Sequence, residues 1–441
     1  MAKYFGTDGI RGKAYEQLTY ELAFSLGKSL AVLKNDRLVI ARDTRESGEM
    51  LVEAIKQGAK ISGIDVLDIG VQPTPKLSYI SQLTKSLGVM VTASHNPYQD
   101  NGIKVFDSGE KLFLEKEELI EQAMDGVVSL DKPLKVGSDL PTIDHCRMYL
   151  KLFQPLLVKT AYRIGLDLAN GATYETAKDI FSRVSDELVV LSDKPDGKNI
   201  NVACGSTHPE ELVWTVKNKG LDFGFSFDGD GDRVLMVGRQ GEIYDGDLMI
   251  YALATYYKQR NELTYNTVIL TQMSNLGIIK ALKKHGIDVI QTQVGDKYVL
   301  EELKNEHGII GGENSGHIIN MKLLNTGDGV LNAISIVKML FDTGKTMDQI
   351  CKDVKLFPSK LHNLRNIEKT LVKHPKVIEK VEQVSKELGE DGFCLIRASG
   401  TEPLVRITIS AETEEIVDTY VETFVKLFTE LNEQFERGEL S

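Results

Sequence analysis

The sequence predicts three related α/β domains with mixed, mostly parallel sheets, followed by a smaller C-terminal α+β domain. A chain of 441 residues exceeds what one hydrophobic core usually organises, so several domains are expected. Short apolar runs alternate with helical patterns along most of the chain, and this alternation predicts parallel strands joined by helices. The last segment instead reads as two strands followed by one long helix.

The first predicted domain spans residues 1–155. Its opening segment, residues 6–12, places three glycines around a threonine, an aspartate and Arg11. Backbone amides in such a segment can approach a phosphate closely, although the same composition also suits a plain turn. The apolar runs that we expect to form strands are residues 37–41, 66–69 and 87–91.

A polar loop follows the third of these runs and carries Ser94, His95 and Lys104. Asn96 precedes a proline and is therefore pushed towards an extended conformation, which constrains the turn around Ser94. Ligands of open α/β sheets bind at the carboxyl ends of strands, where this loop lies. The loop therefore predicts that the Ser94 side chain is accessible to a ligand. The alternative is that Ser94 is an ordinary turn residue.

The second predicted domain, residues 156–257, contains an aspartate triplet directly after the expected strand 223–227. Asp228, Asp230 and Asp232 alternate with glycine, so three carboxylates converge from one loop and repel one another without a cation. A hard ion such as Mg²⁺ suits these oxygens. A calcium loop would place Gly and Glu where Arg233 and Arg239 stand, so calcium is disfavoured, and an acidic surface turn is the remaining alternative.

The third predicted domain, residues 258–366, restarts the pattern with a strand at 268–271 and a helix at 276–284. The tetrapeptide Gly-Ile-Asp-Val occurs at residues 63–66 and again at 286–289, which supports related domains. After a strand at 308–310, a glycine-rich loop holds Glu313, Ser315 and His317. These groups suit a polyhydroxylated ligand, or equally a charged turn.

The fourth predicted domain, residues 367–441, contains strands at 393–397 and 404–409 and a helix at about 412–433. The turn between the strands offers guanidinium, hydroxyl and amide groups, the usual inventory for a phosphate dianion. The residues concerned are Arg397, Ser399, Gly400, Thr401 and Arg406. The polar segment 359–370 is expected to be a linker that acts as a hinge.

The composition excludes two classes of protein. A net charge of −12 disfavours a surface that coats nucleic acid, because such surfaces cluster Lys and Arg. No apolar stretch approaches the roughly 20 residues that a bilayer requires, so a membrane protein is not expected. The four cysteines are scattered and the first residues do not resemble a signal peptide, which indicates the cytoplasm.

Four ordered motifs resemble those of the α-D-phosphohexomutase superfamily, and the resemblance covers the whole chain. They are Thr-Ala-Ser-His-Asn-Pro at 92–97, Asp-Gly-Asp-Gly-Asp-Arg at 228–233, Gly-Glu-Asn-Ser-Gly-His at 312–317 and Arg-Ala-Ser-Gly-Thr-Glu-Pro at 397–403. Residues 5–12 and 204–210 are similar to its glucosamine branch in particular. Ala398 stands where proline is expected, and Gln99 where an aromatic residue is common.

The resemblance implies a four-domain, heart-shaped enzyme in which Ser94 carries a phosphoryl group. It implies Mg²⁺ bound by the three aspartates and a phosphoserine oxygen of Ser94. The acid–base candidates are Lys104, His317 and Arg11, with His95 beside the serine. The residues expected to bind substrate are Glu313, Ser315, Arg233, Arg397, Ser399, Gly400, Thr401 and Arg406.

The implied reaction interconverts glucosamine 6-phosphate and glucosamine 1-phosphate, with a sugar 1,6-bisphosphate as intermediate and activator. The same constellation serves mannose and glucose phosphates, which is the alternative enzyme function. A non-catalytic phosphosugar-binding protein is a third interpretation, which the joint presence of Ser94, Lys104 and the aspartates disfavours. A homodimer is one assembly open to such an enzyme.

Overall fold

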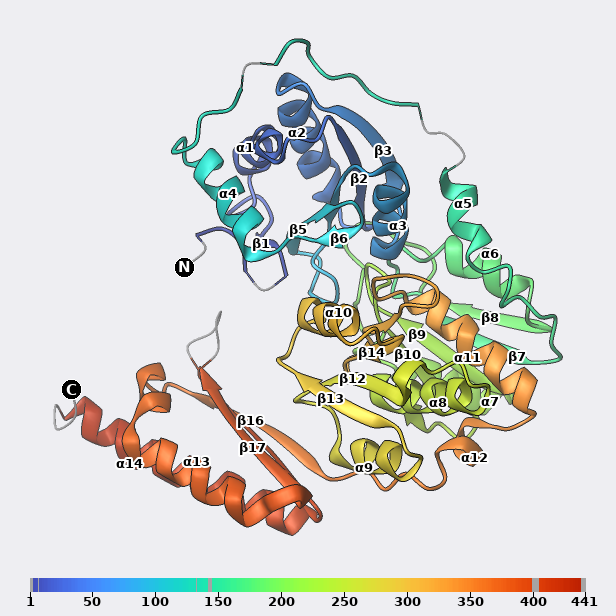
Figure 1. Ribbon diagram of the computed structural model, residues 1–441, viewed down its shortest axis with the longest axis vertical. Coiled ribbons are helices and arrows are strands. Elements are labelled where there is room, and N and C mark those ends of the chain that lie inside the picture. Colours follow the sequence, from blue (N-terminus) through green and yellow to red (C-terminus); the bar gives the residue numbers. More distant parts are fainter. Residues whose placement is uncertain (1–2, 7, 132, 142–144, 399–403, 438–441) are drawn as a thin grey trace. The chain divides into compact units, whose positions relative to one another are not determined.

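The computed structural model describes the chain except for residues 1–2, 7, 132, 142–144, 399–403 and 438–441 (Figure 1). The chain divides into two compact units, Met1–Met273 with Ile287–Lys352, and Ser274–Gly286 with Asp353–Ser441. The first unit holds three mixed sheets, and the second holds one antiparallel sheet.

The first sheet has the strand order β1-β5-β4-β2-β3, with β6 paired to β5. Its strands are β1 Ile10–Lys13, β2 Arg37–Arg42, β3 Asp65–Val71, β4 Leu87–Val91, β5 Asp100–Asp107 and β6 Glu110–Lys111. The helices of this region are α1 Tyr20–Ser29, η1 Leu30–Leu33, α2 Gly48–Ile61, α3 Thr74–Thr84, α4 Leu114–Met124 and α5 His145–Lys151.

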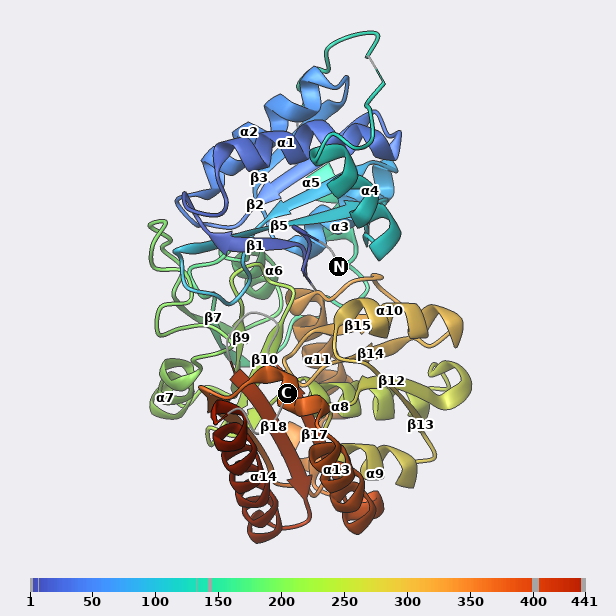
Figure 2. The ribbon, with the colours of Figure 1, turned by 90° about the vertical axis from the view of Figure 1, so that its left-hand side faces the viewer.

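Strand β2 shows why this sheet is covered on both faces. Leu38 and Ile40 belong to the core formed with α1, α2 and α4, whereas Val39 and Ala41 belong to a separate core formed with α3. Successive side chains of a strand point to opposite faces, so a continuous apolar run is expected where helices cover both. Figures 1 and 2 show α1 and α2 on one side of this sheet and α3 on the other.

The second and third sheets have the orders β11-β10-β9-β7-β8 and β13-β12-β14-β15. Their strands are β7 Arg163–Asp167, β8 Glu187–Leu191, β9 Phe223–Phe227, β10 Val234–Gly238, β11 Ile243–Tyr244, β12 Thr267–Thr271, β13 Asp288–Thr292, β14 Ile310–Gly312 and β15 Ile318–Asn320. The helices are α6 Thr176–Ser182, α7 Glu210–Lys219, α8 Gly246–Gln259, η2 Thr264–Asn266, α9 Leu276–Lys284, α10 Asp296–Asn305, α11 Gly329–Thr343 and α12 Met347–Cys351. Helices α8 and α11 are buried nearly all round because they contact both sheets.

The three sheets repeat one arrangement, which confirms the prediction of three related domains. Three parallel strands lie in the orders β4-β2-β3, β9-β7-β8 and β14-β12-β13, each with the first strand of its set in the middle. A fourth strand, β5, β10 or β15, then pairs antiparallel with β4, β9 or β14. The connection to this fourth strand therefore leaves the carboxyl end of a parallel strand at the same topological position in every domain.

The second unit contains an antiparallel sheet of order β16-β18-β17, with β16 Ser359–Arg365, β17 Gly392–Ala398 and β18 Leu404–Ala411. Its helices are η3 Lys369–Lys373, α13 Pro375–Leu388, η4 Gly389–Asp391 and α14 Glu414–Glu436, and α9 also belongs to this unit. Helices α13 and α14 share one core with the sheet, and Figures 1 and 2 show them side by side along it.

The prediction of a linker at residues 359–370 is wrong. Residues 359–365 form β16, which pairs with β18 over its whole length. The strand lies at the sheet edge and most of its side chains are exposed, so its sequence carries no apolar alternation. The predicted boundary between the third and fourth domains, at residue 366, therefore lies after β16, the first strand of the C-terminal sheet.

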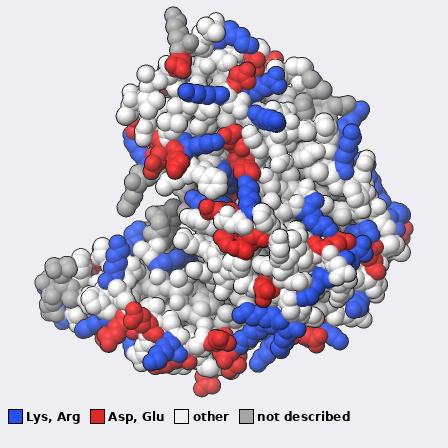
Figure 3. Space-filling view, viewed as in Figure 1, with Lys and Arg blue, Asp and Glu red and all other residues white. Residues whose placement is uncertain are grey.

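The surface carries charged side chains of both signs (Figure 3), and the helices of the described residues are short or polar. Within the described part of the chain, every helix is too short or too polar to cross a bilayer. Figure 3 shows Lys and Arg side chains interspersed with Asp and Glu over the face in view.

Buried Asp328 gives the fold a pH dependence that can be measured. Its carboxylate caps α11 by accepting the Leu331 N–H at 2.9 Å, and it accepts the Tyr149 hydroxyl at 2.7 Å. Burial raises the pKa of Asp328 from 3.8 to about 6, although these hydrogen bonds oppose the shift. Between these two values the folded chain binds the extra proton, so stability falls as pH rises through this window.

We therefore expect Asp328→Asn to remove this loss of stability. Asparagine keeps an acceptor for the helix cap but does not ionise. From pH 4 to pH 8 the parent should lose about 2 kcal/mol of unfolding free energy relative to the variant. Urea unfolding of both proteins across this range measures the difference, and a pH-independent difference would contradict the assignment.

Candidate active site

The connections that leave β4, β9 and β14 meet in the first unit. They carry Ser94, the aspartate triplet and the Glu313–His317 segment, respectively. Hydrogen bonds and ion pairs join the serine loop to the aspartate loop, and the aspartate loop to His317. The repeated topology thus brings together three sequence motifs that lie far apart in the chain.

Ser94 is buried and adopts a left-handed conformation, with φ at 52°. This conformation is costly for a non-glycine residue and calls for support from its surroundings. The Ser94 N–H donates to Thr92 Oγ1 at 2.9 Å, and Ser94 Oγ donates to Asp228 Oδ2 at 2.6 Å. The predicted serine is therefore aimed at the predicted metal ligands.

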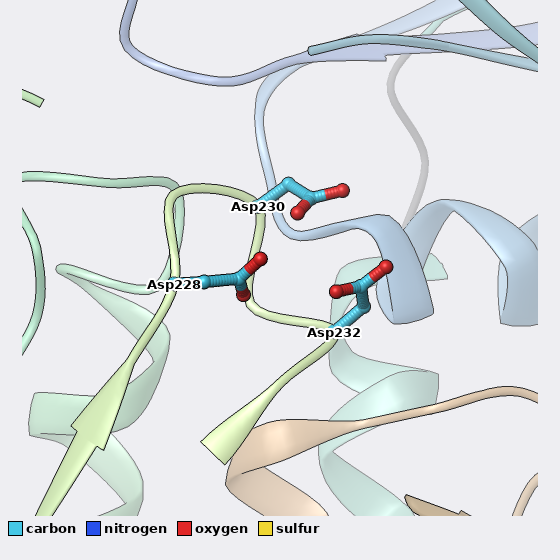
Figure 4. A group of neighbouring side chains, drawn as sticks. All are labelled: Asp228, Asp230 and Asp232. Atoms are coloured by element: carbon cyan, nitrogen blue, oxygen red, sulfur yellow. The ribbon is translucent and has the colours of Figure 1, made fainter. Parts of the chain in front are cut away.

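Two glycines allow the aspartate loop to pack this closely. A Cβ on Gly229 would lie 2.5 Å from the Ser94 carbonyl oxygen, and Gly231 has φ at 73° with Thr173 in the space of its missing side chain. Figure 4 shows the three carboxylates turned towards one another from this one loop. The alternation of Asp and Gly seen in the sequence is thus a steric requirement.

The three aspartates fit a metal ion. One oxygen from each lies within 4.8 Å of the others, and Asp230 Oδ1 and Asp232 Oδ1 are buried without hydrogen-bond partners among the described residues. Burial and the neighbouring carboxylates Asp232 and Asp230 raise the pKa of Asp228 well above its usual range. A bound cation would relieve this repulsion and satisfy the two free oxygens.

Lys104 reaches the same cluster from β5. Its Nζ lies 2.9 Å from Asp230 Oδ2, 3.3 Å from Asp232 Oδ2 and 3.4 Å from Asp8 Oδ2. Burial alone would lower the pKa of Lys104, but Asp230, Asp232 and Asp8 raise it well above its usual range. Lys104 is therefore held in its charged form beside the serine loop.

His317 lies between two carboxylates. Its Nδ1 is 3.6 Å from Asp232 Oδ2 and its Nε2 is 3.4 Å from Asp296 Oδ2. Burial alone would lower the pKa of His317, but Asp232 and Asp296 raise it. In the same loop, Glu313 accepts the Gly295 N–H at 3.1 Å, and buried Ser315 Oγ has no hydrogen-bond partner among the described residues.

The pKa of His95 is shifted in the opposite direction from that of His317. Burial, together with Arg233 and Arg11, lowers its pKa to about 4, so the imidazole is neutral at physiological pH. Its Nδ1 lies 3.4 Å from Arg233 Nη1 and 3.3 Å from Ser94 Oγ. Since arginine only donates, Nδ1 is the nitrogen without a proton. His95 therefore presents a lone pair between the arginine and the serine.

Arg11 contributes from β1, where it pairs with Gly102 of β5 and forms an ion pair with Asp8. Its Nε is buried without a hydrogen-bond partner among the described residues. Both Arg11 and Arg233 thus place positive charge near His95. All predicted site residues of the first unit are accordingly within one connected network except Glu313 and Ser315, which share the His317 loop.

Arg397 and Arg406 belong to the second unit, where they are direct partners across β17 and β18. Opposed residues of an antiparallel pair project from the same face, so two like charges lie side by side. Burial and the charge of Arg406 lower the pKa of Arg397. The pair is thus suited to an anion. Ser399, Gly400 and Thr401 lie outside the described residues.

Several residues of the site were not predicted from the sequence. Arg45 is fully buried and its guanidinium donates to the carbonyls of Ser94, Asn96 and Asp100, each at 2.9 Å. Thr74 Oγ1 donates to Asp230 Oδ2 at 2.5 Å. Lys111 joins Asp8 and Asp296 at 2.7 and 2.6 Å. A charged residue directly after a predicted strand, as in 42–45, is the one signal that could have found Arg45.

Four family models match consecutive parts of the chain. Their descriptions are Phosphoglucomutase/phosphomannomutase, alpha/beta/alpha domain I at residues 2–129, domain II at 146–241, domain III at 245–357, and C-terminal domain at 360–427. The order of these matches follows the three repeated sheets and the C-terminal sheet.

Individual proteins agree with these matches. The chain is 44% identical over 435 residues to a phosphoglucosamine mutase from Bacillus pumilus, covering 96% of this chain and 97% of the relative. It is 42% identical over 440 residues to one from Streptococcus agalactiae, with the same coverage.

Solved structures share the fold. A phosphoglucomutase/phosphomannomutase family protein from Burkholderia thailandensis superimposes with a TM-score of 0.81 at 22% identity, covering 97% of each chain. An N-acetylphosphoglucosamine mutase from Aspergillus fumigatus, solved with GlcNAc-6P and magnesium, gives 0.66 at 18% identity, covering 95% of this chain and 94% of that one. Sequence, topology and site together establish that the chain belongs to the phosphoglucomutase/phosphomannomutase family of the α-D-phosphohexomutase superfamily.

Proposed function

We propose that the protein is a phosphoglucosamine mutase that interconverts glucosamine 6-phosphate and glucosamine 1-phosphate. The observation that carries the proposal is the contact between Ser94 Oγ and Asp228 Oδ2 at 2.6 Å, inside a cluster of three aspartates and Lys104. A hydroxyl in this setting suits phosphoryl transfer, which depends on positioning and charge. The 44% identity to a phosphoglucosamine mutase supports the choice of sugar.

Phosphorylated Ser94 donates its phosphoryl group to the free hydroxyl of the sugar phosphate. The Ser94 O–P bond breaks, a sugar O–P bond forms, and the proton lost by the sugar hydroxyl is balanced by the proton that Ser94 Oγ takes up. The product of this step is the sugar 1,6-bisphosphate. After the bisphosphate reorients, its other phosphoryl group is transferred to Ser94 and the isomeric monophosphate leaves. The phosphorylated form of the enzyme is thereby regenerated.

The charged groups around Ser94 supply positive charge and the candidates for acid–base catalysis. Lys104, one of the acid–base candidates, is held as a cation by Asp8, Asp230 and Asp232, so it places positive charge where phosphoryl oxygens gather. His317, between Asp232 and Asp296, and Arg11 are the other acid–base candidates. Neutral His95 accepts from Arg233 and thereby orients that guanidinium towards the serine.

Asp228, Asp230 and Asp232 would hold Mg²⁺, together with a phosphoserine oxygen of Ser94. When bound, the ion neutralises negative charge on the phosphoryl group. Thr74 and Lys104 already occupy Asp230 Oδ2, so Asp230 Oδ1 remains as the ligand atom. The magnesium in the fungal N-acetylphosphoglucosamine mutase supports this choice of metal.

Glu313 and Ser315 would bind the sugar. The Glu313 carboxylate accepts hydrogen bonds from sugar hydroxyls and favours an ammonium at carbon 2, and Ser315 Oγ has unused hydrogen-bonding capacity. Arg233 would contact the substrate phosphate near the serine.

The free cysteines Cys204, Cys351 and Cys394 fit a reducing cytoplasm, and cell fractionation would test this location.

A coupled assay tests the proposed reaction. The purified protein, with Mg²⁺ and glucose 1,6-bisphosphate present, is given the 1-phosphates of glucosamine, N-acetylglucosamine, glucose and mannose in turn. We expect the highest kcat/KM for glucosamine 1-phosphate. A much higher value for glucose or mannose 1-phosphate would replace the proposed substrate, and inactivity on all four sugars would reject the mutase function.

Arg397, Ser399, Gly400, Thr401 and Arg406 would bind the phosphate that is not reacting. We expect Arg406→Ala to raise KM for the sugar phosphate by about 10- to 100-fold, because it removes one charge-assisted contact to the dianion. It should also increase release of bisphosphate during turnover. Lys360→Ala is the control, since this exposed lysine of β16 pairs with Asp418. Unchanged kinetic constants for Arg406→Ala would contradict the assignment.

A further inference from the structure

Residues 201–210 include the motif at 204–210 and contact the serine loop through Asn201. Asn201 Nδ2 donates to the Ser94 carbonyl at 2.8 Å and to the Asn96 carbonyl at 3.2 Å. Both partners are acceptors, so the amide nitrogen must face them. Asn201 is buried and comes from the second domain, whereas the serine loop comes from the first.

Asn201 is itself held firmly in place. It adopts φ of 59°, a conformation that asparagine tolerates better than most residues. Its own N–H donates to the Ala169 carbonyl at 3.0 Å. Further along, the Gly205 N–H donates to Asp167 at 2.7 Å, and Asp167 also accepts the Ala169 N–H at 3.0 Å. The segment therefore fixes Asn201 on the framework of the second sheet.

The Ser94 carbonyl is held from two sides. Arg45 of the first domain donates to it at 2.9 Å, and Asn201 of the second domain donates at 2.8 Å. Without these donors, Ser94 would relax from its left-handed conformation, which is unfavourable for an L-residue. Such a relaxation would turn Ser94 Oγ away from Asp228.

We propose that Asn201 is a positioning residue for phosphoryl transfer, which locks Ser94 against the aspartate loop. The inference rests on the mutase function proposed above. It assigns the segment 201–210 a role in the rate of the chemical step rather than in recognition of the sugar. Asn201 acts through the carbonyl of Ser94 and touches no reacting atom.

Two substitutions remove the contact without disturbing the backbone. Asn201→Gly keeps the positive φ freely, and Asn201→Asp keeps the shape but replaces the donor by an acceptor. The matched control is Asn170→Gly. Asn170 has φ of 48° in the same domain, but its side chain donates to the Asn199 carbonyl and accepts from the Lys194 N–H.

The readouts are steady-state kcat and KM, the single-turnover rate of transfer from phosphorylated enzyme to glucosamine 1-phosphate, and thermal unfolding. We expect both Asn201 variants to lower kcat and the transfer rate by about 10- to 100-fold. KM should change by less than about twofold. Asn170→Gly should retain the parent transfer rate, with a melting temperature similar to that of Asn201→Gly.

Parent-like transfer in Asn201→Asp would overturn the inference, as would a change confined to KM or to the choice of sugar. A folded Asn170→Gly that loses the same activity would also overturn it, because any disturbance of this region would then suffice. An inactive parent would instead reject the proposed function, so the two failures are distinguishable.

Discussion

Ser94→Ala should lower the mutase activity about a thousandfold or more, because it removes the hydroxyl that carries the phosphoryl group. Ser94 Oγ is the group that reaches Asp228, and its backbone is fixed by Thr92, Arg45 and Asn201. Alanine keeps the loop but offers no atom to phosphorylate. The coupled assay and the intact mass after incubation with glucose 1,6-bisphosphate measure the two consequences.

Ser108→Ala is the matched control for this variant. Ser108, in the turn after β5, also has a positive φ, at 51°, and its Oγ donates to Asp107, the last residue of that strand. It should keep the activity and the phosphorylation of the parent. If Ser94→Ala retained most of the mutase activity, the phosphoserine mechanism would be wrong.

Asp230→Asn should lower kcat by about 100-fold or more, since a metal ion contributes several kcal/mol of charge stabilisation. Asparagine can still accept from Thr74 and Lys104, which hold Asp230 Oδ2 at 2.5 and 2.9 Å. It removes the negative charge and puts an NH2 group, which cannot bind a cation, in the place of the free oxygen. The fold should therefore survive while the affinity for Mg²⁺ falls.

Chelation provides the parallel measurement. EDTA should abolish turnover of the parent without unfolding it, and added Mg²⁺ should restore activity. Asp222→Asn is the control variant, because Asp222 belongs to the same domain but accepts from Arg163. Full activity after extensive chelation, or parent-like binding of Mg²⁺ by Asp230→Asn, would contradict the metal site.

The fold was predictable where burial dictates the sequence. Strands at 87–91 and 223–227 and the helix at 276–284 agree with β4, β9 and α9 because their apolar runs or faces are buried. Strand β16 was missed because only one of its side chains, Leu364, is buried. In α14, Phe424 and Leu431 are buried at helical spacing, whereas at the start of the helix Val417 is buried and Ile416 remains 37% exposed.

The candidate site was predictable only in part. The motifs identified Ser94, the aspartates and the His317 loop because the groups that do chemistry are adjacent in sequence. The residues that hold them are different: Arg45 contacts carbonyls about 50 positions away, and Thr74 and Asn201 contact another domain. Their side chains resemble ordinary polar residues until the fold brings the domains together.

Transfer of labelled phosphate from the enzyme to the sugar tests the central claim most directly. The protein is phosphorylated with ³²P-labelled glucose 1,6-bisphosphate, freed of small molecules and mixed with glucosamine 1-phosphate in a quenched single turnover. We predict that peptide mapping finds the label on Ser94, and that it appears in glucosamine 1,6-bisphosphate at least as fast as steady-state turnover. Label on another residue, or label that stays on Ser94 while the sugar isomerises, would contradict the account.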